Sequence, residues 1–260
     1  MQQCALLMLF ALLFAQLLGA ATRLSATVDE PFHITSGYEY LRTGELRLFD
    51  EHAPLAKALF AWPLFFVPDL SAPETAADYA SGNLIAVTQA MLLAYRPLER
   101  VIVAPRVAAA LLTLLFAATI FRCTASYAGT WVGLLALALC TFDPNFIAHG
   151  SLATTDMGAT TFNFWALWAG MRWLQQSSWR RWLLVALLLG LAQGVKLTAL
   201  LLYPILGIAV LLKAIVQRRQ GAQVLRVLLD YAGIVGVSLL VLWVLYGCEV
   251  RPVAGVLGGV

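Results

Sequence analysis

Hydrophobic residues in this chain gather into long runs that contain no Lys, Arg, Asp or Glu. Seven of these runs are candidate membrane spans, covering residues 4–22, 107–121, 127–142, 157–171, 182–195, 197–212 and 231–248. A helix needs roughly 20 apolar residues to cross a hydrocarbon core, so the shorter runs must include flanking polar residues. The pattern predicts an all-α polytopic membrane protein with about seven transmembrane helices.

Composition agrees with this fold class. The chain is 61% hydrophobic and 12% charged, against roughly 25% charged residues in soluble domains. The net charge of +3 comes from basic residues scattered over several loops, which form no stripe of the kind that binds nucleic acid. The four cysteines show no metal-ligand spacing. We therefore expect membrane lipid and no nucleic acid among the partners.

The basic residues also predict a topology. They occupy alternate short loops, at Arg122, at 172–181 and at 213–226, as the positive-inside rule expects of cytoplasmic loops. The N-terminus is then cytoplasmic, and loops 23–100 and 143–156 face the exterior, which in a bacterial inner membrane is the periplasm. Two alternatives stay open: a cleaved signal peptide at the N-terminus, and a single re-entrant segment around 190–196.

Exterior loop 1, residues 23–100, holds ten of the fourteen acidic residues. Segments 34–41 and 55–66 mix apolar and polar positions in a way that suits short helices lying at the membrane interface. We interpret residues 1–260 as one transmembrane domain with this loop and a smaller exterior loop 2 at 143–156. The chain stops soon after its last apolar run, so we expect it to be incomplete at the C-terminus.

Two adjacent carboxylates, Asp29 and Glu30, follow the first apolar run and precede Pro31. A carboxylate at the membrane surface, beside a second negative charge, can have its pKa raised by burial and by its neighbour, as a general base requires. The alternative is an ordinary pair of solvated loop charges with Pro31 starting a helix.

Further along the same loop, His52 and Lys57 lie close to the carboxylates Asp50 and Glu51. Lys57 could hold a phosphate as a point charge. It could equally be a lysine of an amphipathic helix that snorkels to lipid headgroups.

Exterior loop 2 places His149 and Asp156 before the next span. They could steer an incoming group or bind a divalent cation, with Asp156 as the candidate ligand, although two residues do not define a metal site. Asp156 could also be a helix N-cap.

Two basic residues sit at the exterior ends of apolar runs, Arg106 and Lys196. An ionisable group at membrane depth tends to face a cavity or a partner, and a phosphate is a plausible partner for Arg106. Snorkelling to headgroups is the alternative for both.

These motifs, taken in order, resemble the GT-C superfamily of membrane glycosyltransferases, in particular glycosyltransferase family 39, with its protein O-mannosyltransferases and the related aminoarabinose transferases. The resemblance rests on Asp29-Glu30-Pro31-Phe32-His33, Gly37-Tyr38-Glu39-Tyr40-Leu41, Glu51-His52-Ala53-Pro54-Leu55-Ala56-Lys57, Pro144-Asn145-Phe146-Ile147-Ala148-His149-Gly150, Thr154-Thr155-Asp156, and Gly190-Leu191-Ala192 with Lys196. It implies an enzyme that moves a sugar from a polyprenyl-phosphate donor to an acceptor hydroxyl on a protein or glycolipid.

The resemblance also implies residue roles. Asp29 would be the catalytic base, with Glu30 as its neighbour. Lys57 and Arg106 would contact the donor phosphate, and His52, His149, Asp156 and Lys196 would line the substrate cavity. The family implies no certain cofactor, and a divalent cation stays open.

Two features depart from the family pattern. Ala53 stands where these enzymes commonly have the first proline of a His-Pro-Pro-Leu motif, and about seven spans is fewer than the eleven or more of family members. The second departure favours a truncated chain. Two other functions therefore stay open: a transporter or flippase of a lipid-linked substrate, and a catalytically silent subunit or fragment of the GT-C type.

Overall fold

In the computed structural model the chain folds into helices joined by turns and loops. The structure describes residues 1–48, 52–217 and 221–248, and no strand occurs in these ranges. The helices are α1 (Gln2–Arg23), α2 (Glu30–Thr43), α3 (Pro54–Ala61), α4 (Leu84–Thr88), α5 (Leu98–Ala128), α6 (Thr130–Phe142), α7 (Pro144–Gly150), α8 (Thr155–Gln175), α9 (Trp179–Val195), α10 (Leu202–Val216) and α11 (Gly221–Leu245). Short helical turns η1 (Trp62–Phe66), η2 (Pro73–Thr75), η3 (Gln89–Leu93) and η4 (Leu197–Leu201) complete the list.

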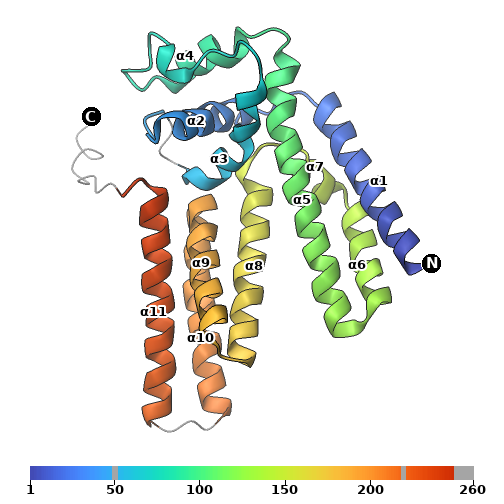
Figure 1. The fold of residues 1–260 in the computed structure, drawn as a ribbon, viewed down its shortest axis with the longest axis vertical. Helices are drawn as coiled ribbons and strands as arrows, with labels where there is room; N and C mark the ends of the chain where they lie inside the picture. The colour runs from blue at the N-terminus through green and yellow to red at the C-terminus, as the bar shows by residue number, and fades with distance from the viewer. Residues whose placement is uncertain (49–51, 218–220, 249–260) are drawn as a thin grey trace.

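The long helices run side by side and reverse direction at each turn (Figure 1). Four of them are long and apolar enough to cross a membrane: α1, α5, the continuous η4–α10 segment and α11. Helices α6 and α7 form a fifth candidate if they are taken as one span bent by 68°. The fold class is that of an all-α polytopic membrane protein.

Most of each predicted apolar run is helical, although Gly129 interrupts run 127–142 and run 231–248 extends beyond α11 into a turn. The helices differ in length. Helix α9 has 17 residues and α6 has 13, so neither reaches by itself the roughly 20 residues of a perpendicular span. Helix α8 is longer, but it begins with the polar residues Thr155 and Asp156. The segment around 190–196 is the end of α9, and α10 is a separate helix beyond η4.

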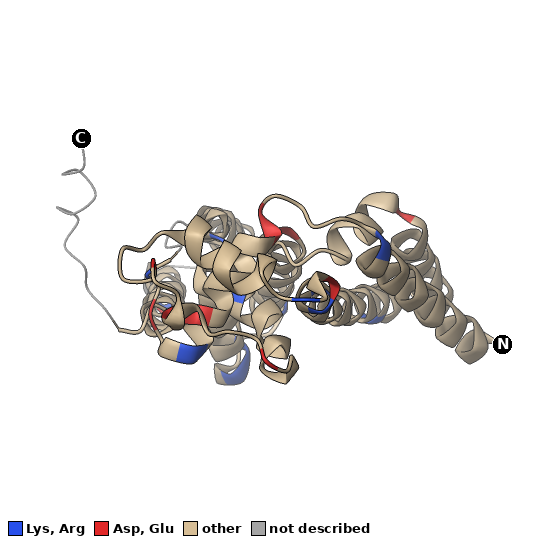
Figure 2. Cartoon of the chain, turned by 90° about the horizontal axis from the view of Figure 1, so that it is seen from above, with Lys and Arg blue, Asp and Glu red and all other residues tan. Residues whose placement is uncertain are grey.

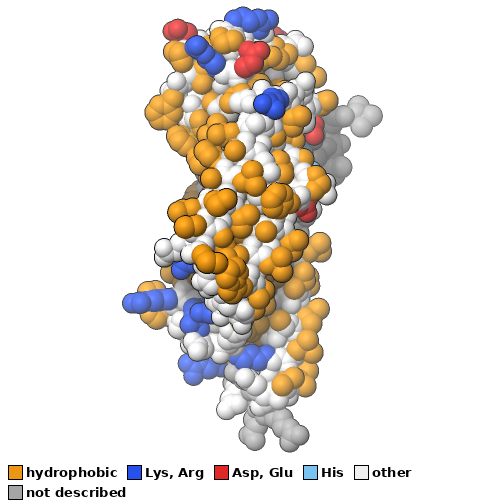
Figure 3. All heavy atoms as spheres, turned by 90° about the vertical axis from the view of Figure 1, so that its right-hand side faces the viewer, with side chains coloured by type: hydrophobic (Ala, Val, Ile, Leu, Met, Phe, Trp, Pro, Cys, Tyr) orange, Lys and Arg blue, Asp and Glu red, His pale blue; other side chains and the backbone are white. Residues whose placement is uncertain are grey.

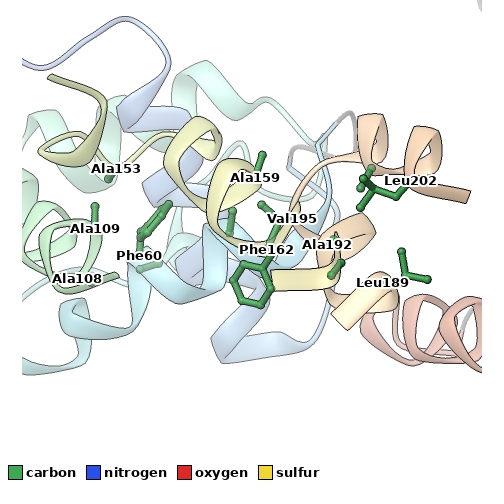
Figure 4. Close-up of a cluster of buried hydrophobic side chains, with 14 of the residues drawn as sticks. Phe60, Ala108, Ala109, Ala153, Ala159, Phe162, Leu189, Ala192, Val195 and Leu202 are labelled. Carbon is green, nitrogen blue, oxygen red and sulfur yellow. The ribbon is translucent and has the colours of Figure 1, made fainter. Parts of the chain in front are cut away.

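The helices pack through two buried clusters in which alanine and glycine allow close approach. One buried cluster joins α1, α5 and α6 through Leu13, Leu17, Ala110, Ala117 and Leu137. A larger cluster joins α2, α3 and α5 to α8–α11, and Figure 4 shows its alanines beside Phe60 and Phe162. A Cβ on Gly190 would lie 2.6 Å from the carbonyl oxygen of Ser238 in α11. Close contact between small residues is how helices pack in lipid, where no hydrophobic effect drives them together.

Helices α2, α3 and α4 lie across the upper ends of the long helices in Figure 1. The predicted interfacial segments 34–41 and 55–66 fall in α2 and in α3–η1. Helix α2 ends at Gly44, whose φ of 74° suits glycine. Helices α2 and α3 approach so closely that a Cβ on Gly37 would overlap the backbone carbonyl of Lys57. This contact fixes α3, and with it Lys57, against α2.

The two ends of the helices differ in charge. Seen from above, the short helices and their loops carry most of the acidic residues (Figure 2), and Figure 3 shows an apolar middle zone with acidic side chains above it. Within the described ranges, Asp230 is the one acidic residue at the lower end. Arg122, Arg172, Arg180, Arg181, Lys213 and Arg226 also lie there. The predicted alternation of charged loops therefore corresponds to two opposite ends of the structure.

Candidate active site

Glu30 and Arg106 form a buried ion pair at the upper end of α5. The guanidinium of Arg106 donates from Nε to Glu30 Oε1 at 2.8 Å and from Nη2 to Oε2 at 2.6 Å. The side chains of Arg106 and Glu30 are 1% and 0% exposed. A planar guanidinium and a carboxylate match each other in this two-bond geometry, so the pair is rigid.

Apart from a long contact at 3.4 Å from the Thr27 hydroxyl to Glu30 Oε2, the further bonds of this pair go to backbone. Arg106 donates to the carbonyl oxygens of Ala21 (2.9 Å), Leu24 (2.8 Å) and Ser25 (2.9 Å). Glu30 accepts from the amides of Thr27 and Ala153, both at 2.9 Å. The pair therefore ties the end of α1, the start of α2 and exterior loop 2 to α5. This occupies the guanidinium that we expected at the donor phosphate.

The electrostatics of Glu30 follow from these contacts. Burial raises the pKa of the Glu30 carboxyl, but the hydrogen bonds from Arg106, Thr27 and Ala153 outweigh burial, and the pKa lies below its usual range. Glu30 is therefore a stable carboxylate at neutral pH, held by hydrogen bonds from three residues. Such a carboxylate is poorly suited to take a proton from a substrate.

Asp29, the preceding residue, has the opposite surroundings. Its side chain is exposed, and although Asp29 is the N-cap of α2, its carboxylate makes no capping hydrogen bond. In the part of the chain that the structure describes, this carboxylate makes no hydrogen bond or ion pair. Of the two candidate carboxylates, Asp29 is the one that a substrate can reach.

His33 follows Asp29 by one helical turn and is buried, with 6% exposure. Its ring lies edge-on to the ring of His52, with centroids 5.1 Å apart. Burial, together with His52 and Lys57, lowers the pKa of His33 to about 4, and the carboxylates Asp29 and Asp156 act in the opposite direction. His33 is therefore neutral at pH 7 and lies within electrostatic reach of four predicted site residues. Sequence reasoning left it out, although its spacing of four from Asp29 places both on one helix face.

Lys57 is buried on α3, with 1% exposure, and acts electrostatically on His33 and on the buried Glu39. Burial raises the pKa of the Glu39 carboxyl, which accepts hydrogen bonds from the amides of Arg47 and Leu48. Because Lys57 lies inside the protein, it does not snorkel along the surface to lipid headgroups. Asp50 and Glu51, which precede His52 in the sequence, lie outside the described residues.

Asp156 is the centre of a second, solvent-facing group. Its Oδ1 accepts from Lys196 Nζ at 2.9 Å, and its Oδ2 lies 3.7 Å from His149 Nδ1. The side chains of Asp156, Lys196 and His149 are 50%, 36% and 54% exposed. Thr154 is the N-cap of α8, so the N-cap alternative for Asp156 is wrong. Asp156 is the second residue of α8 and lies in its first turn, where a carboxylate is stabilised by the positive end of the helix dipole.

The described ranges contain no group of three His, Cys, Asp or Glu side chains arranged to hold a metal ion. The candidate cation ligand Asp156 has Lys196 and His149 as its neighbours. Below α3, a groove of about 260 Å³ runs along α5. It is lined by apolar residues only, Leu59, Phe60, Trp62, Ala108, Leu111, Leu112 and Leu115.

The helices, the upper layer of short helices and the group of ionisable residues define a membrane protein with a polar site at one end. A family model for dolichyl-phosphate-mannose-protein mannosyltransferases matches residues 85–246, more than half of the chain. The chain belongs to this family, whose members are glycosyltransferases of the GT-C type. Curated proteins and solved structures gave no significant match. The matched region contains Arg106, His149, Asp156 and Lys196, whereas Asp29 and Lys57 precede it.

Proposed function

We propose that this chain transfers a sugar from a polyprenyl-phosphate donor to an acceptor hydroxyl at the exterior face of the membrane. The observation that carries the proposal is the convergence of Asp29, His52, Lys57 and Asp156 around His33, at the end of a fold whose family uses lipid-linked sugars. The basic loops at the other end favour a cytoplasmic N-terminus, and a bacterial inner membrane fits this topology.

Asp29 is the proposed catalytic base. Its exposed carboxylate can accept the proton of an acceptor hydroxyl as that oxygen attacks the anomeric carbon of the donor sugar. Inversion at this carbon in one step requires no second, nucleophilic carboxylate. Glu30 supports Asp29 by holding the start of α2, since both of its oxygens are already bonded.

Lys57 is the proposed contact for the donor phosphate. The departing polyprenyl phosphate gains negative charge in the transition state, and a fixed ammonium in a buried site stabilises that charge strongly. The apolar groove between α3 and α5 begins at Leu59, two residues after Lys57, and can hold the first isoprene units. Arg106 acts as a positioning residue, because its guanidinium is bonded to Glu30 and to three carbonyl oxygens.

Asp156, His149 and Lys196 form the acceptor side of the proposed cavity. They are solvent-accessible polar groups near the start of α8 and the end of α9. Asp156 is near enough to act on the pKa of His33. Exposed groups can exchange water for the hydroxyls of a sugar or of an acceptor at little cost. The acceptor itself is a hydroxyl of a protein or of a glycolipid.

The proposal is tested with the purified chain, polyprenyl-phosphate sugars and acceptors of both kinds, by following the release of polyprenyl phosphate. Wild type should release it, and Asp29→Asn and Lys57→Met should lower the rate at least about a hundredfold, as loss of a general base or of a charge stabiliser does. Asp78→Asn, an exposed acid in the same loop, should leave the rate unchanged.

Two outcomes would contradict the roles assigned here. Equal release by wild type, Asp29→Asn and Lys57→Met would overturn the catalytic assignment. Donor binding with no release by any form would assign the chain as a silent subunit. Elution of each variant at the volume of wild type in size-exclusion chromatography separates loss of chemistry from loss of fold.

A further inference from the structure

A second polar pocket lies at the opposite end of the helices from the candidate active site. It has a volume of about 430 Å³ and is formed by the turn between α8 and α9 together with the first turns of α11. Its lining residues are Trp173, Ser177, Ser178, Trp179, Trp182, Arg226 and Asp230. The opening therefore presents three tryptophans, one cation and one anion together.

The walls of this pocket are fixed by contacts between helices. Trp173 is buried, with 5% exposure. Trp182 donates from its indole nitrogen to the carbonyl oxygen of Asp230 at 2.8 Å, and its ring packs where a Cβ on Gly233 would lie 3.0 Å away. The turn before α9 is set by Ser178, whose hydroxyl accepts from the amide of Arg181. The pocket is thus held by the fold before any ligand arrives.

Its two charges do not neutralise each other. Arg226 and Asp230 are exposed and stand four residues apart on α11, yet the structure forms no ion pair between them or between either one and another described residue. The order with the basic residue first is the less favourable one for pairing along a helix. A cation and an anion are therefore both presented to whatever enters between the tryptophan rings.

We propose that this pocket binds the headgroup of a zwitterionic phospholipid, of the phosphoethanolamine class. Arg226 is placed to pair with the phosphate, and Asp230 with the ammonium. A headgroup with a phosphate but no ammonium would leave Asp230 without a counter-charge from the ligand. Exposed Leu225 and Leu229 on the same helix offer an apolar surface along which acyl chains can lie.

The position along the helices supports a lipid rather than a soluble ligand. Tryptophans are enriched where hydrocarbon meets water, since the ring is apolar and the indole nitrogen is polar. The turn between α8 and α9, which forms part of the pocket, lies at the lower end of the helices in Figure 1, and the same end carries Arg172, Arg180 and Arg181. Arg180 stacks over Trp179 at 5.6 Å from the ring centroid, so the basic rim adjoins the pocket.

The test uses native mass spectrometry of the full chain in detergent, with phosphatidylethanolamine and phosphatidylglycerol of identical acyl chains. Wild type should bind the first phosphatidylethanolamine roughly tenfold more tightly than phosphatidylglycerol. Asp230→Asn should abolish this preference, and Arg226→Gln should weaken binding of both lipids. Arg122→Gln removes an exposed arginine from the same end of the helices and should bind like wild type.

Three outcomes would overturn the proposal. Equal or tighter binding of phosphatidylglycerol by wild type would indicate a simple basic patch. A preference for phosphatidylethanolamine that survives in Asp230→Asn would place the lipid elsewhere. Displacement of the lipid by an equal concentration of soluble phosphoethanolamine would show that the natural ligand carries no acyl chains. Unchanged elution of both variants in size-exclusion chromatography confirms that they are folded.

Discussion

The buried pair Glu30–Arg106 and the exposed pair Asp156–Lys196 both link segments that are far apart in the sequence, and both join a carboxylate to a cation. Their surroundings differ completely. The side chains of the first pair are at most 1% exposed, and their charged ends are hydrogen-bonded to the protein. The side chains of the second pair are 36–50% exposed. A buried and fully bonded charge can hold elements together, and a solvated one can be released to bind something else.

The same contrast separates Asp29 from Glu30, although they are neighbours in the chain. Glu30 points into the protein and is fixed by Arg106 and two amides, while the carboxylate of Asp29 stays in solvent. Helix α2 begins between them, so its first turn carries one carboxylate inward and leaves the other outside. One of two adjacent acids can therefore have a structural role while the other is available for chemistry. The difference between them is burial, not residue type.

Removal of one partner from the buried pair should have the largest effect. Glu30→Gln leaves the guanidinium of Arg106 buried without its counter-charge, and we expect a loss of about 3–5 kcal/mol of stability. Thermal unfolding in detergent, followed by tryptophan fluorescence, measures this loss. The double variant Glu30→Gln/Arg106→Met should recover part of it because no charge remains buried. If the double variant is less stable than Glu30→Gln, the pair is not the cause.

The pH dependence of stability should show the next largest effect, through His33. Its pKa falls from 6.5 to about 4 on folding, so the unfolded chain binds a proton that the folded chain excludes. His33 should therefore cost stability as pH falls from about 6.5 to 4, by about 3 kcal/mol in total. Wild type should lose more stability than His33→Gln over this interval. Parallel curves for the two proteins would refute the buried, neutral histidine.

The contact between α2 and α3 predicts a moderate effect. Gly37→Ala places a methyl group against the backbone carbonyl of Lys57, and we expect a loss of about 1–3 kcal/mol, as for other overpacked sites. Gly19→Ala is the matched control, because a Cβ there would meet no atom within 4 Å and alanine favours the helix. Thermal unfolding of the two variants should move in opposite directions.

The exposed pair should show the smallest effect on stability. Asp156→Asn and Lys196→Gln should each change the free energy of unfolding by less than about 1 kcal/mol, with a difference that shrinks further in high salt. Both should nevertheless slow sugar transfer if the pair lines the acceptor side of the site. A large loss of stability in either variant would make this pair structural, like Glu30–Arg106.

Much of the fold could be predicted from the sequence, because apolar runs in a membrane protein fix where helices lie. The number of spanning helices was harder to predict. Runs such as 182–195 are shorter than a bilayer requires, and α6 is continued by α7 at an angle of 68° that residues 127–142 do not encode locally. The upper layer of short helices was also predictable, since prolines interrupt its mixed apolar and polar segments.

The candidate site could be predicted only in part. Asp29 and Asp156 were singled out by their positions at the ends of helices, and the structure places both within reach of His33. The partner of Arg106 could not be inferred, since Glu30 is 76 positions away in the sequence. An arginine near a membrane boundary is equally consistent with a phosphate ligand. Burial depends on how the elements pack in three dimensions, and the local pattern of one chain does not reveal it.

The hydrogen bond from the amide of Ala153 to Glu30 has a consequence for how the protein is made. A ribosome delivers Glu30 and Arg106 before Ala153, so the segment from α2 to α5 is made while one hydrogen bond to the Glu30 carboxylate is still missing. Until α7 has followed, Glu30 Oε1 can accept from Arg106 Nε but not from the amide of Ala153. The candidate active site is therefore completed late, when the residues that precede α8 are made and the amide of Ala153 reaches Glu30.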